Sequence, residues 1–199
     1  PWKFSGPVQK IATDALRLRH KLLPYIYTMN YRTHTECRAI CEPMYYAYPE
    51  DENAYNCKNE FFFGTELIVA PITEHTSLKT NLAGVKVWIP EGRYTDIFTD
   101  RIYSGNQFVK MFRDIETIPV LAKEGTIIPL SMDKGNFAGN PSKLEVDVYS
   151  GKGEFKVTGM IGQTMDESVN VAYSYIKSNN KEFNVDDKLF NSNDVSAVL

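Results

Sequence analysis

The hydrophobic positions between residues 61 and 130 fall into short runs of β-branched and aromatic residues. Such residues favour the pleated, half-buried surface of a β-sheet. The runs cover residues 61–63, 67–71, 85–90, 93–99, 107–112, 118–121 and 126–130. Turn residues such as Glu91-Gly92 and Glu124-Gly125 separate them. Many short strands at close spacing predict a mainly β fold, with an antiparallel β-sandwich over this part of the chain.

Alternation along these runs also predicts which side chains face the core, because successive residues of a strand point to opposite faces. The residues expected to point inward are Val87, Ile89, Ile97, Val120, Ile127 and Leu130. Trp88 falls on the face opposite to Val87 and Ile89. It is therefore expected either to meet a ligand or to pack in a core or against a neighbouring domain, and packing is the commoner role of such an aromatic.

The first part of the chain has a helical period instead. Its apolar positions are Val8, Ile11, Ala12, Ala15, Leu16, Leu18, Leu22, Leu23 and Ile26. Ser5-Gly6-Pro7 is typical of a helix start, and Pro24 should kink the helix, which can continue to about Arg32. A lone helix with so wide an apolar stripe is not stable alone, so it must dock on another surface.

Beyond residue 131 the pattern is weaker. Residues 132–141 are rich in Gly, Asn and Asp and resemble a linker. Residues 144–149 alternate as a strand does, and residues 154–158 are its expected partner across the Ser150-Gly151-Lys152-Gly153 turn. Residues 169–176 suggest another strand, and residues 184–199 a short helix or a frayed end.

Three stretches resemble glycoside hydrolase family 31, which holds α-glucosidases and α-xylosidases. They are Gly64-x-x-Leu67-Ile68-Val69-Ala70-Pro71, Trp88-Ile89-Pro90-x-Gly92-x-Tyr94-x-Asp96, and Ile118-Pro119-Val120-x-x-Lys123-x-Gly125-x-Ile127-Ile128-Pro129. The helix around Leu18-Arg19-x-x-Leu22-Leu23-Pro24 resembles the last helix of the family's catalytic barrel. Pro1-Trp2 resembles the family's Pro-Trp just downstream of its active-site histidine. Glu42 stands where the family usually has an arginine, which leaves a charge-pair role at that position open.

The resemblance implies three regions and a role. Residues 1–60 correspond to the end of the TIM barrel, residues 61–131 to the proximal C-terminal β-sandwich, and residues 142–199 to further β segments that either complete the sandwich or begin a distal domain. The family's two catalytic aspartates lie on barrel strands before Pro1. The implied function is that of a non-catalytic, structural C-terminal domain of a retaining α-glycosidase, with the upstream barrel as its partner.

The composition disfavours several other classes of protein. The chain has 199 residues, 43% of them hydrophobic, and a net charge of -3, which disfavours a nucleic-acid surface. Its longest apolar runs are too short to cross a membrane. Three cysteines favour reduced thiols and a cytoplasmic setting over a disulfide framework. Because the chain starts at Pro1, we expect an excised piece of a larger protein.

Three groups of residues could carry chemistry, and the sequence predicts no catalytic, substrate-binding, metal or cofactor site in any of them. The carboxylates Asp96, Asp100, Asp114 and Glu116 lie at turns or strand ends, without the paired arrangement that glycoside hydrolysis needs. His34, Cys37, Cys41 and Cys57 do not match a standard zinc spacing. Trp88, Tyr94, Phe98 and Tyr103 could stack against a sugar, although core aromatics are the simpler interpretation.

Two other functions remain open beside the glycosidase domain: a stand-alone carbohydrate-binding module, and a dimerisation or scaffold unit. Without a barrel, the apolar stripe of the helix could fold back on the sandwich, stay disordered, or pair with the same stripe of a second chain. Twofold pairing is the commonest way for a single chain to cover such a stripe. We therefore expect a homodimer, or a higher assembly, with Leu18 and Leu22 at its interface.

Overall fold

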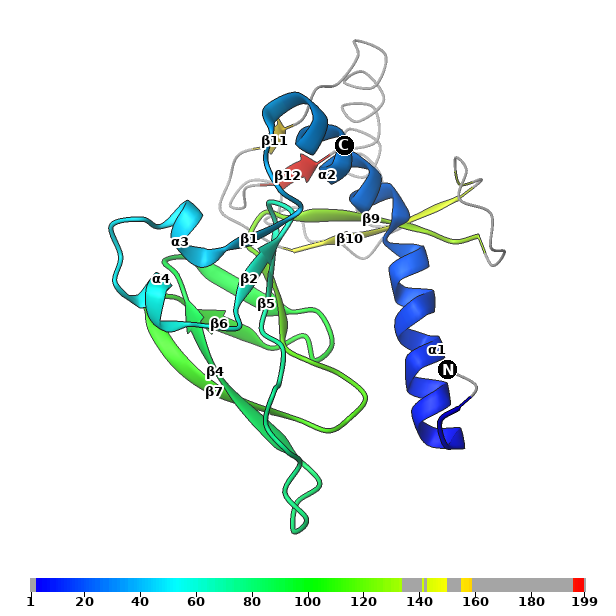
Figure 1. The fold of residues 1–199 in the computed structure, drawn as a ribbon. Coiled ribbons are helices and arrows are strands. Elements are labelled where there is room, and N and C mark those ends of the chain that lie inside the picture. The colour runs from blue at the N-terminus through cyan, green and yellow to red at the C-terminus, as the bar shows by residue number, and fades with distance from the viewer. Residues whose placement is uncertain (1–2, 134–140, 142, 150–154, 159–194, 199) are drawn as a thin grey trace, which may run out of the picture.

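The computed structural model describes residues 3–133, 141, 143–149, 155–158 and 195–198 (Figure 1). The helices are α1 (Gly6–Lys21), α2 (Leu23–Glu36), α3 (Met44–Ala47) and α4 (Asn53–Asn56). The strands are β1 (Cys41–Pro43), β2 (Phe61–Phe63), β3 (Leu67–Val69), β4 (Ala83–Ile89), β5 (Arg93–Asp96), β6 (Ile102–Ser104), β7 (Gln107–Arg113), β8 (Val120–Lys123), β9 (Ile127–Ser131), β10 (Leu144–Val148), β11 (Phe155–Thr158) and β12 (Val195–Val198). None of the described helices is long and apolar enough to span a bilayer.

Six strands form one antiparallel sheet in the order β1-β2-β3-β8-β5-β6. β4 and β7 form a separate antiparallel ribbon, and β9 pairs with β10 in the same sense. β11 and β12 pair in parallel. The mainly β fold with a helical N-terminus, predicted from the hydrophobic pattern, is confirmed.

Alternation along the central strands β3 and β8 sends side chains into two separate cores. Ile68 and Leu121, which are 1% and 0% exposed, pack with the β4–β7 ribbon in the first core. Leu67 and Ala122, which are 1% and 0% exposed, pack with α2 and β9 in the second core. The six-stranded sheet is therefore the middle layer of the molecule, with the ribbon on one face and α2 with β9 on the other.

The N-terminal helical stretch is divided at Leu22, whose φ of -75° and ψ of 2° end the regular helix. Pro24 lies in the first turn of α2, where a missing N–H removes no helical hydrogen bond. The predicted break near Pro24 is confirmed, and the helical stretch continues past Arg32 to Glu36. In Figure 1, α1 stands beside the sandwich, whereas α2 lies nearer to β9.

α2 is joined to the sheet by Tyr25 and Met29, which are 0% and 2% exposed. The Tyr25 hydroxyl donates a hydrogen bond of 2.7 Å to the carbonyl oxygen of Phe63. Gly64 makes this approach possible, because its φ is 69° and a Cβ there would lie 2.2 Å from the Tyr25 Oη. α2 therefore belongs structurally to the second core.

Two expectations about strands are wrong. Val87, Ile89, Val120 and Leu130 are buried as expected, but Ile97 and Ile127 are only half-buried, and the buried residue beside Ile127 is Ile128, which is 2% exposed. Ile127 and Leu130 are three positions apart, so they cannot share one face of a strand.

The second error concerns strand pairing near the C-terminus. β10 pairs with β9, from Leu144 opposite Ser131 to Val148 opposite Ile127, and β11 pairs with β12. β10 is the alternating strand that we expected to pair with residues 154–158. The expected strand at 169–176 and most of the expected linker lie outside the described residues.

Candidate functional site

A groove runs between the N-terminal helices and the sandwich, with a volume of about 710 Å³. Its helical wall includes Leu18, Leu22 and Ile26, and its sandwich wall includes Phe98 and Val120. The other lining residues are Lys10, Ile11, Asp14, Ala15, Arg17, Arg19, Lys21, Phe63, Ile115, Glu116, Thr117 and Ile118. An apolar hollow with a charged rim is typical of a surface that another part of a protein covers.

The helical wall is only partly covered by the chain itself. None of the 16 residues of α1 is buried, and Leu16 is 57% exposed. The polar side carries an ion pair, in which Lys10 Nζ lies 2.9 Å from the Asp14 carboxylate. The apolar side of α1 therefore remains available for a further contact.

The four carboxylates considered in the sequence have different surroundings. Asp96 is fully buried, binds Arg113 of β7, and accepts a 3.0 Å hydrogen bond from the backbone N–H of Phe98. Asp114 accepts a 2.9 Å hydrogen bond from the backbone N–H of Glu116. Asp100 and Glu116 are exposed. Asp96 and Asp114 thus have structural roles, and the lack of a catalytic pair stays a prediction.

The histidine and cysteine side chains also differ in their exposure to solvent. His34, Cys37 and Cys41 are exposed, whereas Cys57 is buried. Burial raises the pKa of the Cys57 thiol to about 11. Within the described ranges, no group of three or more His, Cys, Asp and Glu side chains could hold a metal ion.

The aromatic residues that could have formed a sugar platform lie mostly inside the sandwich. Trp88 and Tyr94 are 2% and 1% exposed, and both belong to the first core. The Trp88 ring meets the Tyr48 ring edge-on, with a centroid separation of 5.3 Å. Tyr103 is half-buried, and only Phe98 of the four is exposed. Trp88 and Tyr94 are therefore core aromatics.

Glu60 is a buried carboxyl that the sequence analysis missed. It is 6% exposed, one oxygen accepts a 2.8 Å hydrogen bond from the backbone N–H of Trp88, and the other has no partner in the described structure. Burial raises the pKa of Glu60 to about 8. Its position two residues before Phe62, which packs against the first core, was a signal for this placement.

We expect Glu60 to make the protein less stable as the pH rises from about 4 to about 8. Below this range the carboxyl is protonated in both states, and within it only the unfolded chain, with a Glu pKa of about 4.3, loses the proton. Above about pH 8 the effect is constant. Glu60→Gln should remove this slope, on the order of a few kcal/mol over the range, in urea unfolding followed by circular dichroism.

The matched control is Glu50→Gln, since Glu50 is exposed. Its pH profile should follow that of the wild type. Parallel profiles for Glu60→Gln and the wild type would show that Glu60 ionises at its ordinary pKa in the folded protein, contrary to the prediction.

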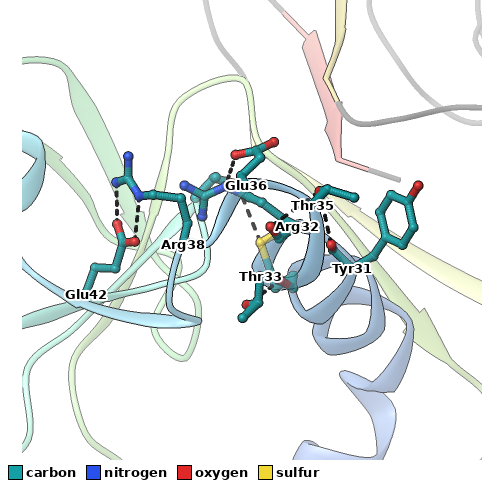
Figure 2. A network of polar contacts seen from close by, with 9 residues as sticks. Tyr31, Arg32, Thr33, Thr35, Glu36, Arg38 and Glu42 are labelled. Carbon is teal, nitrogen blue, oxygen red and sulfur yellow. Dashed lines mark hydrogen bonds and ion pairs between the residues drawn. The ribbon is translucent and has the colours of Figure 1, made fainter.

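Two ion pairs lie where the end of α2 leads into β1 (Figure 2). Arg38 binds Glu42 with both its Nε and a terminal nitrogen, the Nε contact being 2.7 Å, and Arg32 Nε lies 3.1 Å from Glu36. Glu42 is 5% exposed, and its hydrogen bond to Arg38 lowers the pKa of the Glu42 carboxyl. Glu42 therefore does take part in a charge pair, and its partner is Arg38, four residues earlier.

Two family models match consecutive parts of this structure. The glycosyl hydrolases family 31 TIM-barrel domain matches residues 1–29, and the glycosyl hydrolase family 31 C-terminal domain matches residues 38–128. A third model, the Lon protease (S16) C-terminal proteolytic domain, matches residues 113–198. The first part of this match includes β8, which pairs with β3, and β9, which pairs with β10. Most of the rest of the match lies outside the described residues.

Curated relatives point to the same family. Alpha-glucosidase 2 of Bacillus thermoamyloliquefaciens is 30% identical over 77% of this chain and 19% of its own length. The alpha-xylosidase of Saccharolobus solfataricus is 27% identical over 76% of this chain and 20% of its own length. The chain thus spans about a fifth of the length of these relatives.

Solved structures agree in fold as well as in sequence. A GH31 dextranase of Flavobacterium johnsoniae, complexed with glucose, has a TM-score of 0.61 and 32% identity over 66% of this chain and 16% of its own. The cycloalternan-forming enzyme from Listeria monocytogenes has a TM-score of 0.65 and 31% identity over 76% of this chain and 15% of its own. The chain belongs to glycoside hydrolase family 31, and it corresponds to the end of the barrel and the C-terminal β domain of these enzymes.

Proposed function

We propose that the chain serves as the carboxy-terminal, non-catalytic part of a retaining α-glycosidase of the α-glucosidase or α-xylosidase type. In this proposal α1 completes a catalytic barrel, and the sandwich supports the barrel from outside. A cytoplasmic setting is part of the proposal. The observation that carries it is the groove between α1 and the sandwich, because α1 matches the barrel model while its apolar side is left partly uncovered.

The two helices divide this role between them. α2 has two buried anchors on the second core, Tyr25 and Met29, whereas no residue of α1 is buried. Burying a leucine or isoleucine side chain is worth about 1.5–3 kcal/mol. Covering Ile11, Leu16 and Leu18 would therefore stabilise a protein that carries the barrel far more than it would stabilise the chain as it stands.

The test uses a protein in which this chain follows the barrel encoded upstream in its own gene. We expect it to hydrolyse an aryl α-glucoside or an aryl α-xyloside, and we expect Leu18→Asp to lower both its melting temperature and its activity. In the 199-residue chain, Leu18→Asp should change stability much less, because Leu18 is only half-buried there. Leu78→Asp is the matched control, since Leu78 is 99% exposed.

Equal losses from Leu18→Asp with and without the barrel would contradict the proposal, as would an upstream region without two barrel-strand aspartates. In the predicted homodimer, a second chain rather than a barrel would cover the apolar stripe of the N-terminal helix. Light scattering on the 199-residue chain and on Leu22→Asp distinguishes the two, because only a dimer through Leu18 and Leu22 would dissociate.

A further inference from the structure

A second cavity shares no lining residue with the groove and is lined mainly by polar and charged residues. It has a volume of about 570 Å³ and is lined by Tyr48, Glu91, Gly92, Arg93, Lys123 and Glu124. Known small-molecule pockets range from about 300 to 1,000 Å³. The lining comes from the β4–β5 turn with the first residue of β5, from the last residue of β8 with the β8–β9 turn, and from the segment after α3.

The walls of this cavity are held in place by backbone hydrogen bonds. Glu124 N donates to Arg93 O at 2.8 Å, and Gly105 N donates to Gly92 O at 2.7 Å. Tyr48 is fixed from behind by ring contacts with Trp88 and Phe62. A site whose groups are already positioned loses little conformational freedom when a ligand binds.

Gly92 lies in the cavity wall beside Glu124 and Tyr94. Its φ is 121°, a conformation that favours glycine, and a Cβ there would make ordinary contacts of 3.5 Å with Glu124 Oε1 and 3.7 Å with Tyr94 Cε2. Glu124 Oε1 accepts a 3.3 Å hydrogen bond from Arg93 N, while Glu124 Oε2 is buried without a protein partner. The Tyr94 hydroxyl is buried beside Tyr48 without a well-formed hydrogen bond. Buried polar atoms of this kind normally have a partner.

The charges of the lining select the class of ligand. Two carboxylates, Glu91 and Glu124, stand beside two cations, Arg93 and Lys123. An anion would meet the carboxylates and a metal cation would meet the cations, so either would be disfavoured. A neutral ligand rich in hydroxyl groups can donate to the carboxylates, accept from the cations and lie against the Tyr48 ring.

We propose that this cavity binds a neutral saccharide, with Glu124 accepting from a sugar hydroxyl and with Arg93 and Lys123 donating to ring or hydroxyl oxygens. The site belongs to the β domain and goes beyond the function proposed above. It uses neither of the buried aromatics Trp88 and Tyr94 as a stacking surface.

The 199-residue chain is titrated with maltotriose and with isomaltotriose, and binding is followed by saturation-transfer NMR. The tryptophan fluorescence is followed as well, since one of the two tryptophans, Trp88, contacts Tyr48. We expect saturable binding of at least one sugar, weakened tenfold or more by Glu124→Ala and by Lys123→Ala. Lys123 is exposed, so its substitution leaves the fold intact, and urea unfolding checks this for both variants. Glu116→Ala and Lys110→Ala, at exposed positions outside the cavity, should bind as the wild type does.

Inorganic phosphate is titrated in parallel. Phosphate binding that Lys123→Ala abolishes would identify an anion site and overturn the saccharide proposal. A folded wild-type chain that binds neither sugar would overturn it too, as would sugar binding that both cavity variants retain.

Discussion

Replacing Arg113 with alanine is expected to lower the free energy of unfolding by about 3–5 kcal/mol, because it would leave the Asp96 carboxylate buried without its counter-charge. Asp96 is 0% exposed, and the Arg113 side chain is 11% exposed. The pair joins β5 of the central sheet to β7 of the ribbon, across the first core. Urea unfolding followed by circular dichroism measures the loss.

Lys110→Ala is the matched control for this substitution, since Lys110 lies on β7 but is exposed. It should cost less than about 0.5 kcal/mol. The double variant Asp96→Leu with Arg113→Met should recover most of the lost stability, because apolar side chains of similar volume can replace a buried ion pair. An Arg113→Ala midpoint equal to that of Lys110→Ala would show that Asp96 is not held as a buried charge.

Ile128→Ala is expected to destabilise the protein by about 2–5 kcal/mol, the usual range for removing a buried isoleucine side chain. Ile128 is 2% exposed and packs in the second core with α2. Ile127→Ala is the matched comparison, in the same strand and with the same atoms removed, but at a half-buried position. Its cost should be clearly smaller in the same urea experiment.

Equal costs for the two isoleucines would mean that β9 presents both faces to a core. A larger cost for Ile127 would mean that Ile127, and not Ile128, faces the core, as the hydrophobic pattern predicted. Either result would contradict the packing of β9 against α2.

Much of the fold could be predicted because the local sequence of a strand indicates its β conformation. Runs such as 85–90 and 107–112 carry their own β preference, and the β4–β7 ribbon that they form has a short sequence separation. The pairing of β3 with β8 could not be predicted in this way, because it joins Leu67 to Ala122 across more than fifty residues. Nothing in either strand alone specifies that partner.

The burial of some individual side chains could not be predicted from the sequence either. A strand with both faces buried has no alternation to interpret, and in β9 four of the five residues are buried. Glu60 was missed because a single glutamate is normally solvated, and only its parity with Phe62 indicated the core. The cavity at Gly92 depends on the turns at Glu91-Gly92 and Glu124-Gly125. The sequence predicts each turn separately, but they are more than thirty residues apart, so it does not indicate that they meet.

The break at Leu22 has a consequence for how such proteins can exchange parts. Because Tyr25 and Met29 anchor α2 to the sandwich while α1 has no buried residue, the mechanical boundary lies inside the helical stretch. A recombination event that joined this sandwich to a different barrel would preserve the second core only if the crossover fell near Leu22. A crossover in the loop after Glu36 would instead separate Tyr25 from the Phe63 carbonyl that it binds.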